Sequence, residues 1–298
     1  MNKVSDIAKN IVYQSLPLTI LFAVRFKVVF VFYNKYRLLH LGKVMPRYML
    51  LLLIITSLFV PYAQAKFVDV VAKIKPSVVG VGIHTPTSRP QNILRGTGFV
   101  IGDGRYIVTN EHVLPTLLDE SLLQKVAVFI GTGRNAKVRK AEVVAKSSLY
   151  DLAILKISGP ALPAVTLANS DFYPDGSAIA FTGFPIGSVL GLYPVTHRGI
   201  IASITPTVIP AVSAEQINLK MLKRMKNPYL VYQLDATAYP GNSGSALYDM
   251  ETGDVVGIIN KVFVQGTKEA VISTPSGITY AIPVKYLHQV LKDNNIKI

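Results

Sequence analysis

The sequence of 298 residues contains no cysteine. This absence excludes disulfide bonds, thiolate metal sites and a cysteine nucleophile together. It does not exclude export, because a chain of this length can bury a stable core without covalent cross-links.

Charged residues are also scarce, at 16%, whereas half of the residues are hydrophobic. This composition allows a sizeable core and excludes wholesale disorder. The formal net charge is +14, but residues 1–65 hold 8 of the 31 basic residues and one acid, Asp6. Residues 66–298 carry 23 basic and 16 acidic residues, a net charge of +7 without a dense basic run. The charge therefore indicates solubility and no nucleic-acid partner, and leaves open a weak attraction to anionic membranes or cell-wall polymers.

The apolar stretch from Met49 to Val60 is too short for a comfortable membrane span, which needs about 20 residues. Residues 45–65 instead combine a basic start at Arg47, a 12-residue apolar stretch from Met49 to Val60, and the small-x-small site Ala63-Gln64-Ala65. These are the three parts of a secretory signal peptide, in order. We expect cleavage after Ala65, a mature domain at 66–298, and only transient membrane contact through the signal peptide.

Residues 1–44 form an upstream extension that two hypotheses fit. In the first hypothesis, translation starts at Met45 and the extension is a misassigned start. In the second, the apolar patches at 16–24 and 28–33 belong to a first membrane segment. The second hypothesis gives a membrane-anchored protein if residues 1–60 are retained.

The mature chain is dominated by short β-type segments that Gly, Pro, Asn or Asp punctuate. They form two groups of about six, separated near residues 158–170, at 77–83, 97–101, 106–109, 126–129, 141–145, 153–157, and then 178–182, 195–204, 229–234, 245–248, 255–264, 279–283. This pattern predicts an all-β fold of two barrels, at about 66–160 and 171–285. Apolar periodicity predicts a helix at each end, along Phe67, Val70, Val71, Ile74 and along Val284, Leu287, Val290, Leu291.

The strongest local motif is the segment 239–245, YPGNSGS. Glycines on both sides of Ser243 permit a tight backbone that aims several N–H groups at one point, as the stabilisation of a developing oxyanion requires. We expect the N–H groups of Gly241 and Ser243, with that of Asn242, to form this site. By itself the motif is equally typical of an ordinary hairpin turn.

A serine nucleophile needs a base, and the base needs a carboxylate to orient it. Of the four histidines in the mature chain, His112 alone follows directly after a β-like run and opens a loop. Asp151 stands at the mouth of the hydrophobic segment 152–157. We therefore predict a Ser243–His112–Asp151 triad; the alternatives are a structural histidine and a turn-capping aspartate.

Four motifs, in this order and spacing, resemble the HtrA (Deg) family of trypsin-like serine proteases: Gly96-Thr97-Gly98-Phe99-Val100-Ile101, Thr109-Asn110-Glu111-His112-Val113, Asp151-Leu152-Ala153-Ile154-Leu155-Lys156 and Gly241-Asn242-Ser243-Gly244. The resemblance covers about residues 67–291. It implies two six-stranded antiparallel β-barrels and a serine endopeptidase that acts on exported or misfolded polypeptides through an acyl-enzyme, without a cofactor or metal. Secreted eukaryotic proteases of this fold usually contain disulfides, so the lack of cysteine favours a bacterial, periplasmic or extracellular protein.

Two features depart from the family pattern. Ser245 and Ala246 replace the Gly-Pro that commonly follows the Ser-Gly of the family motif, and only 55 residues follow Ser243, which predicts a protease domain without a PDZ domain. The predicted substrate pocket contains no acid, which favours aliphatic over basic side chains, and consists of Thr237, Ala238, Ile258, Ile259 and Asn260.

Two alternative functions remain open at this point. One is a pseudoprotease that only binds peptides, and the other is a membrane-tethered protease. The oligomeric state is open as well, and an oligomer is compatible with the sequence. The long connection Pro206–Pro228 holds four basic residues. We expect it to gate the site or to dock an acidic partner; the alternative is a tolerant surface loop.

Overall fold

The computed structural model describes residues 62–298 except 134–135, 188–190, 208–227 and 263–276. The upstream extension 1–44, most of the predicted signal peptide and most of the connection Pro206–Pro228 lie outside these residues. Helix α3 (Tyr62–Ile74) begins before the predicted cleavage point after Ala65. Among the residues described, no helix is long and apolar enough to cross a membrane.

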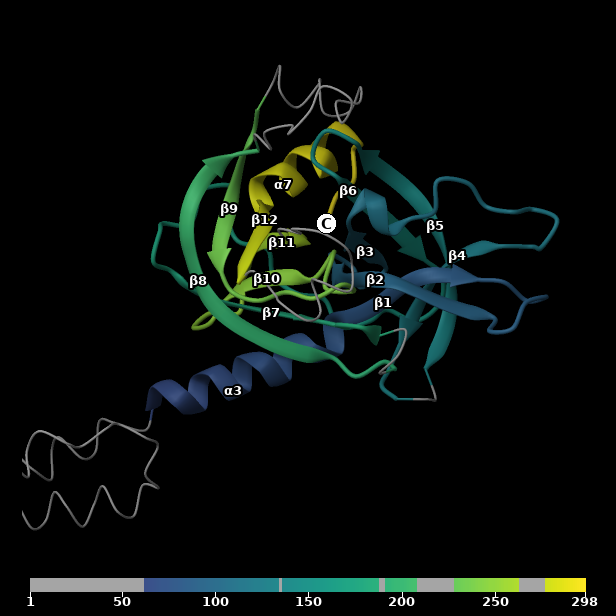
Figure 1. Cartoon of the computed structure of the whole chain (residues 1–298), viewed down its shortest axis with the longest axis horizontal. Coiled ribbons are helices and arrows are strands. Elements are labelled where there is room, and N and C mark those ends of the chain that lie inside the picture. Colours follow the sequence, from purple (N-terminus) through teal and green to yellow (C-terminus); the bar gives the residue numbers. More distant parts are fainter. Residues whose placement is uncertain (1–61, 134–135, 188–190, 208–227, 263–276) are drawn as a thin grey trace, which may run out of the picture. The chain divides into compact units, whose positions relative to one another are not determined.

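Barrel one is closed by six antiparallel strands in the order β1-β2-β3-β6-β5-β4 (Figure 1). The strands are β1 (Val78–His84), β2 (Asn92–Ile101), β3 (Tyr106–Thr109), β4 (Lys125–Ile130), β5 (Lys137–Ser147) and β6 (Leu152–Ile157). Closure pairs every strand on both sides, so that neither edge of the sheet is left open.

Barrel two repeats this architecture in the order β10-β11-β12-β9-β8-β7. Its strands are β7 (Ala178–Gly183), β8 (Val195–Pro206), β9 (Leu230–Asp235), β10 (Ala246–Asp249), β11 (Val255–Val262) and β12 (Ile278–Pro283). The predicted two-barrel, all-β fold is confirmed, and each of the twelve predicted segments overlaps one strand.

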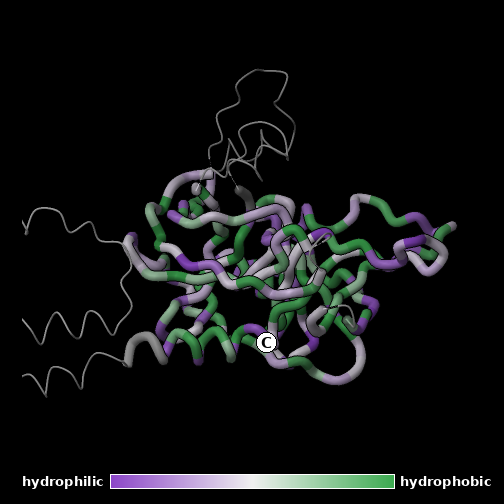
Figure 2. The backbone as a smooth tube through the Cα atoms, turned by 60° about the horizontal axis from the view of Figure 1, so that its bottom comes forward, coloured by the Kyte–Doolittle hydropathy of each residue, from purple (hydrophilic) through white to green (hydrophobic). Residues whose placement is uncertain are grey.

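The helices pack through the faces that the periodicity predicts. In α3, Val70 and Ile74 are buried, while Val68 is 65% exposed. In α7 (Val284–Asp293), all four predicted apolar positions are buried. Figure 2 shows the alternation of short hydrophobic and hydrophilic stretches along the tube, as expected where one face of each element meets the core.

Three hydrophobic clusters form the core of the part of the chain that the structure describes. One lies in barrel one and includes Val81 and Leu155, and another lies in barrel two and includes Phe181 and Tyr232. The third is shared, since it joins Phe99 of β2 to residues of both barrels and both helices. The two barrels therefore pack against each other through an apolar interface.

The linker between the barrels is bonded to both of them. Its Val165 N–H donates to the Val100 carbonyl of barrel one at 3.0 Å, and its Ala168 N–H donates to the Val255 carbonyl of barrel two at 2.9 Å. The Ala168 carbonyl also accepts from His288 of α7 at 2.8 Å. The linker is thus part of the interface between the barrels.

Candidate active site

Asp151 lies in the turn that leads into β6 and is 1% exposed. Its φ of 55° lies in the left-handed region, which aspartate tolerates better than most residues. Its carbonyl accepts from the Glu111 N–H and from the Asn110 side chain, both at 3.1 Å. These bonds hold the short helical turn η2 (Glu111–Val113), which follows β3, against the start of β6.

The Asp151 carboxylate binds His112 at two points. Its Oδ1 accepts from the His112 backbone N–H at 3.0 Å, and its Oδ2 contacts the ring Nδ1 at 2.7 Å. A carboxylate only accepts, so Nδ1 carries the proton and Nε2 keeps a free lone pair. The His112 side chain is 36% exposed whereas that of Asp151 is 2% exposed. The imidazole can therefore take up a proton at Nε2 and be stabilised, when charged, by a buried acid.

Ser243 lies in a turn of barrel two that glycine makes possible. The Asn242 N–H donates to the Tyr239 carbonyl at 3.0 Å, Pro240 is second in the turn, and Gly241 is third with φ of 103°. These features fit a type II turn, which requires positive φ at its third residue. A side chain at Gly241 would also collide with the Phe184 carbonyl.

The turn leaves two backbone N–H groups free. Among the described residues, neither the Gly241 N–H nor the Ser243 N–H donates to another group. In both cases the carbonyl of the same peptide is bonded: Pro240 accepts from Ile186 N–H at 2.8 Å, and Asn242 accepts from Ser245 N–H at 3.0 Å. A trans peptide is planar, so a bonded carbonyl directs its N–H the opposite way. Of the three donors expected for an oxyanion, Asn242 uses its N–H within the turn.

The segment of Ser243 lies next to that of His112. A side chain at Gly96 would meet both Val113 and the Ser243 carbonyl within 3.0 Å. The Ser243 hydroxyl, however, donates to the Asn260 carbonyl at 3.0 Å, and no hydrogen bond between the two described side chains of Ser243 and His112 is present. Hydrogen bonds between catalytic side chains are often long or poorly aligned until substrate binds, so this geometry is compatible with a joint role of Ser243 and His112.

The five predicted pocket residues fall into different surroundings. Thr237 is half-buried, whereas Ala238 and Ile259 lie in the core of barrel two. Ile258 belongs to the shared cluster, on the other side of β11. Asn260 is 8% exposed and lies at an irregularity of β11, with its carbonyl on the Ser243 hydroxyl.

Two contacts of the turn at residues 239–243 were not expected from the sequence. In one, the Ile186 N–H donates to the Pro240 carbonyl. The φ of Ile186 is 50°, a conformation that a β-branched residue rarely adopts. The Thr97 hydroxyl donates to the Gly241 carbonyl at 2.7 Å. The Gly-Thr-Gly motif was visible as part of the resemblance, but nothing in its letters indicates a contact 144 residues away.

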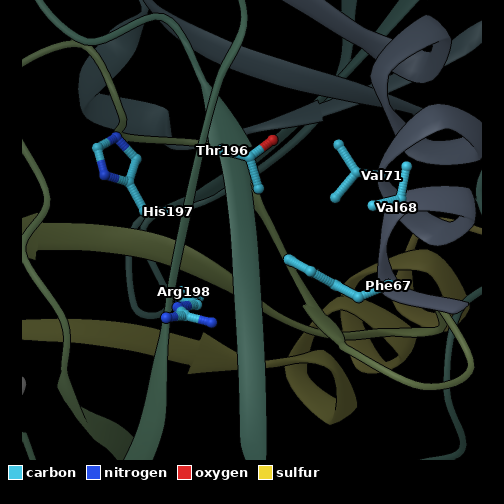
Figure 3. A pocket seen from close by; sticks show the side chains of 6 residues that line it. All are labelled: Phe67, Val68, Val71, Thr196, His197 and Arg198. Atoms are coloured by element: carbon cyan, nitrogen blue, oxygen red, sulfur yellow. The ribbon is translucent and has the colours of Figure 1, made fainter. Parts of the chain in front are cut away.

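A separate depression of about 380 Å³ lies between α3 and β8. Figure 3 shows that the His197 ring lies on the opposite side of β8 from Phe67, Val68 and Val71 of α3. The ring stacks on Phe181, and its burial lowers the pKa of His197 below the ordinary value of 6.5. The His197 Nε2 is 3.5 Å from the side-chain amide of Asn242, so the ring contacts the turn that precedes Ser243. Within the described ranges, no three His, Asp or Glu side chains are grouped so as to hold a metal ion.

Comparison with known proteins matches residues 96–258 to the trypsin-like peptidase domain. The chain is similar to proteins named "Probable periplasmic serine endoprotease DegP-like" from Halomonas elongata (30% identity over 63% of this chain and 32% of that protein) and from Chlamydia trachomatis (29% over 73% and 38%). It spans only about a third of the length of these relatives. A solved HtrA-type protease with a tripeptide superposes with a TM-score of 0.56 at 26% identity, covering 78% of this chain and 64% of that one. The chain therefore belongs to the trypsin-like peptidase family, and the proteins to which it is similar include proteases of the HtrA type.

Proposed function

We propose that this chain is a serine endopeptidase in which Ser243 is the nucleophile, His112 the general base and Asp151 the residue that orients it. The observation that carries the proposal is the double contact of His112 with the buried Asp151, at 3.0 and 2.7 Å. Beside it stand the unbonded N–H groups of Gly241 and Ser243. The His112–Asp151 pair supplies proton transfer, and the two N–H groups stabilise the charge that develops on the substrate carbonyl.

The reaction proceeds through an acyl-enzyme. The Ser243 hydroxyl turns from the Asn260 carbonyl to Nε2 of His112, gives up its proton there and attacks the peptide carbonyl carbon. The tetrahedral oxyanion is held by the Gly241 and Ser243 N–H groups, and the proton on His112 passes to the leaving amine. Water, deprotonated by His112, then attacks the ester carbonyl. The bond to the Ser243 oxygen breaks, the carboxylic acid product leaves, and the proton returns from His112 to the Ser243 hydroxyl.

The hydrogen bond between the Ser243 hydroxyl and the Asn260 carbonyl supports one alternative, a protein that binds peptides without cleaving them. A hydrogen bond of this kind contributes about 0.5–1.5 kcal/mol net, and 1.4 kcal/mol is a factor of about ten in population. Enzymes of this class accelerate hydrolysis by many orders of magnitude. The Ser243–Asn260 bond therefore slows the reaction at most modestly, and hydrolysis remains the better-supported function.

Labelling with a fluorophosphonate tests the proposal. The wild-type protein should gain one phosphonyl group, located at Ser243 by peptide mass spectrometry, and should hydrolyse casein. Ser243→Ala should be neither labelled nor active, because loss of the nucleophile typically costs several orders of magnitude in rate. Its thermal unfolding should stay as in the wild type. Labelling elsewhere, or turnover by the variant, would reject the assignment.

The substrates we propose are unfolded or exported polypeptides outside the cytoplasm, in keeping with relatives that are named periplasmic. Export should then follow cleavage after Ala65, as the segment 45–65 predicts. N-terminal sequencing of the extracytoplasmic protein should find Lys66 first. A chain that still begins at Met1 or Met45 would favour the membrane-tethered alternative.

A further inference from the structure

Thr97 of β2 is fully buried at the interface between the barrels, and its polar atoms bond the turn at residues 239–243. Its hydroxyl donates to the Gly241 carbonyl at 2.7 Å and accepts from the Phe184 N–H at 3.0 Å. Its backbone N–H donates to the Ser243 carbonyl at 2.9 Å. One residue of barrel one thus bonds the turn of barrel two at two carbonyls, on either side of Asn242.

These bonds fix the peptides around the two free N–H groups. The peptide between Gly241 and Asn242 is held at its carbonyl by Thr97 and at its N–H by Tyr239. The peptide after Ser243 is held at its carbonyl by Thr97 and at its N–H by the Ile259 carbonyl. Because peptide units are rigid, the unbonded N–H groups of Gly241 and Ser243 are oriented by these neighbours.

We propose that Thr97 is a positioning residue for the oxyanion site, a role that rests on the proposed function of Ser243. Its hydroxyl keeps the Gly241–Asn242 peptide in the orientation that directs both free N–H groups at one point. The interface between the barrels thereby becomes a requirement of catalysis as well as of the fold.

The surroundings of the hydroxyl leave little room for a substitute. A side chain at Gly183 would come within 2.9 Å of the Thr97 hydroxyl, so the second barrel approaches this point with bare backbone. Replacing the hydroxyl by a methyl group of similar size keeps the packing but leaves the Gly241 carbonyl and the Phe184 N–H without their partner. Unpaired groups of this kind favour a rearranged backbone.

The experiment compares Thr97→Val with Thr97→Ser and with the matched control Thr182→Val. Thr182 is equally buried in a strand, but its hydroxyl bonds the side chains of Thr196 and Tyr248, both at 2.9 Å. Thr97→Ala removes the same hydroxyl and is used if the valine variant does not fold. The readouts are kcat and KM for casein and the rate of phosphonylation of Ser243, each measured equally far below the melting temperature of the variant.

We expect Thr97→Val to lower kcat and the phosphonylation rate together by about ten- to a hundredfold, as for loss of one oxyanion-site donor or less. KM should change by less than about twofold, Thr97→Ser should retain most of the activity, and Thr182→Val should lose stability only. Phosphonylation of Thr97→Val, or of Thr97→Ala in its place, at the wild-type rate would overturn the proposal. So would a Thr97→Ser variant as impaired as Thr97→Val. Failure of the wild-type protein to react at all would instead overturn the proposed function, and with it the role of Thr97.

Discussion

The two barrels contribute different kinds of parts to the candidate site. Barrel one contributes side chains, and the contact between His112 and Asp151 is complete within that barrel. Barrel two contributes Ser243 together with the backbone turn that carries it, and the carbonyls of that turn are bonded by Ile186 and by Thr97 of barrel one. The His112–Asp151 pair, for which we propose proton transfer, is therefore built locally, whereas the turn for which we propose charge stabilisation is completed by packing between the barrels.

The largest expected effect comes from breaking the contact between His112 and Asp151 in barrel one. In Asp151→Asn, the amide can donate to Nδ1 of His112, which places the ring proton on Nε2, where the base must accept. We expect casein hydrolysis to fall roughly 10⁴-fold, the loss that the corresponding change produces in a Ser-His-Asp protease. The control is Asp171→Asn, an exposed carboxylate bonded to the Asn169 side chain, which should keep wild-type activity. More than a tenth of the activity in Asp151→Asn would contradict the role of Asp151.

A second prediction separates packing between the barrels from backbone strain. Gly244 and Gly176 have nearly the same φ, 87° and 86°, but a side chain at Gly244 would collide with the Thr97 carbonyl, whereas nothing lies within 4 Å at Gly176. Alanine at Gly176 should cost roughly 1–2 kcal/mol of unfolding free energy through its conformation alone. Alanine at Gly244 should cost about 3 kcal/mol or more, because the interface must also move apart. Urea unfolding measures both, and equal losses would show that the barrels do not constrain the turn.

The smallest expected effect concerns pH and barrel two alone. Burial lowers the pKa of His197 in the folded protein below its unfolded value. Well above the unfolded pKa of about 6.5 the ring is neutral in both states, so it adds no pH dependence there. As the pH falls below that value, the unfolded state binds a proton first, and the wild-type protein loses stability.

His197→Gln should therefore show a shallower fall in unfolding free energy between pH 7 and pH 5 than the wild type. The difference should be small, because the ring is only partly buried and solvent screens its charge. Parallel pH profiles of the two proteins would contradict the prediction.

The fold could be predicted from the sequence because its signals are local. Turn residues separate short β-type segments, and the helical faces at Val70 and Leu287 follow a simple period. The residues of the candidate site were also visible, since His112, Asp151 and Ser243 each stand in a recognisable motif. The contact between His112 and Asp151 follows that prediction, while their joint role with Ser243 stays a prediction.

The parts that could not be predicted depend on contacts between distant segments or on backbone atoms. The Asn260 carbonyl that holds Ser243, the Ile186 N–H and the Thr97 hydroxyl act through positions that only the folded chain brings together. Likewise, the predicted pocket treated Ile258 and Ile259 as neighbours, but successive residues of a strand face opposite sides. Sequence order indicates which chemistry is present and does not show what supports it.

The bonded linker between the barrels has a consequence for how the domain unfolds. Opening either barrel would expose the hydrophobic cluster that both share and would release the bonds of Val165 and Ala168. Neither barrel can then be lost while the other keeps its full set of contacts. We therefore expect the two barrels to unfold as one cooperative unit, so that a destabilising substitution in the barrel that lacks Ser243 lowers the population of folded Ser243 sites as much as one beside it.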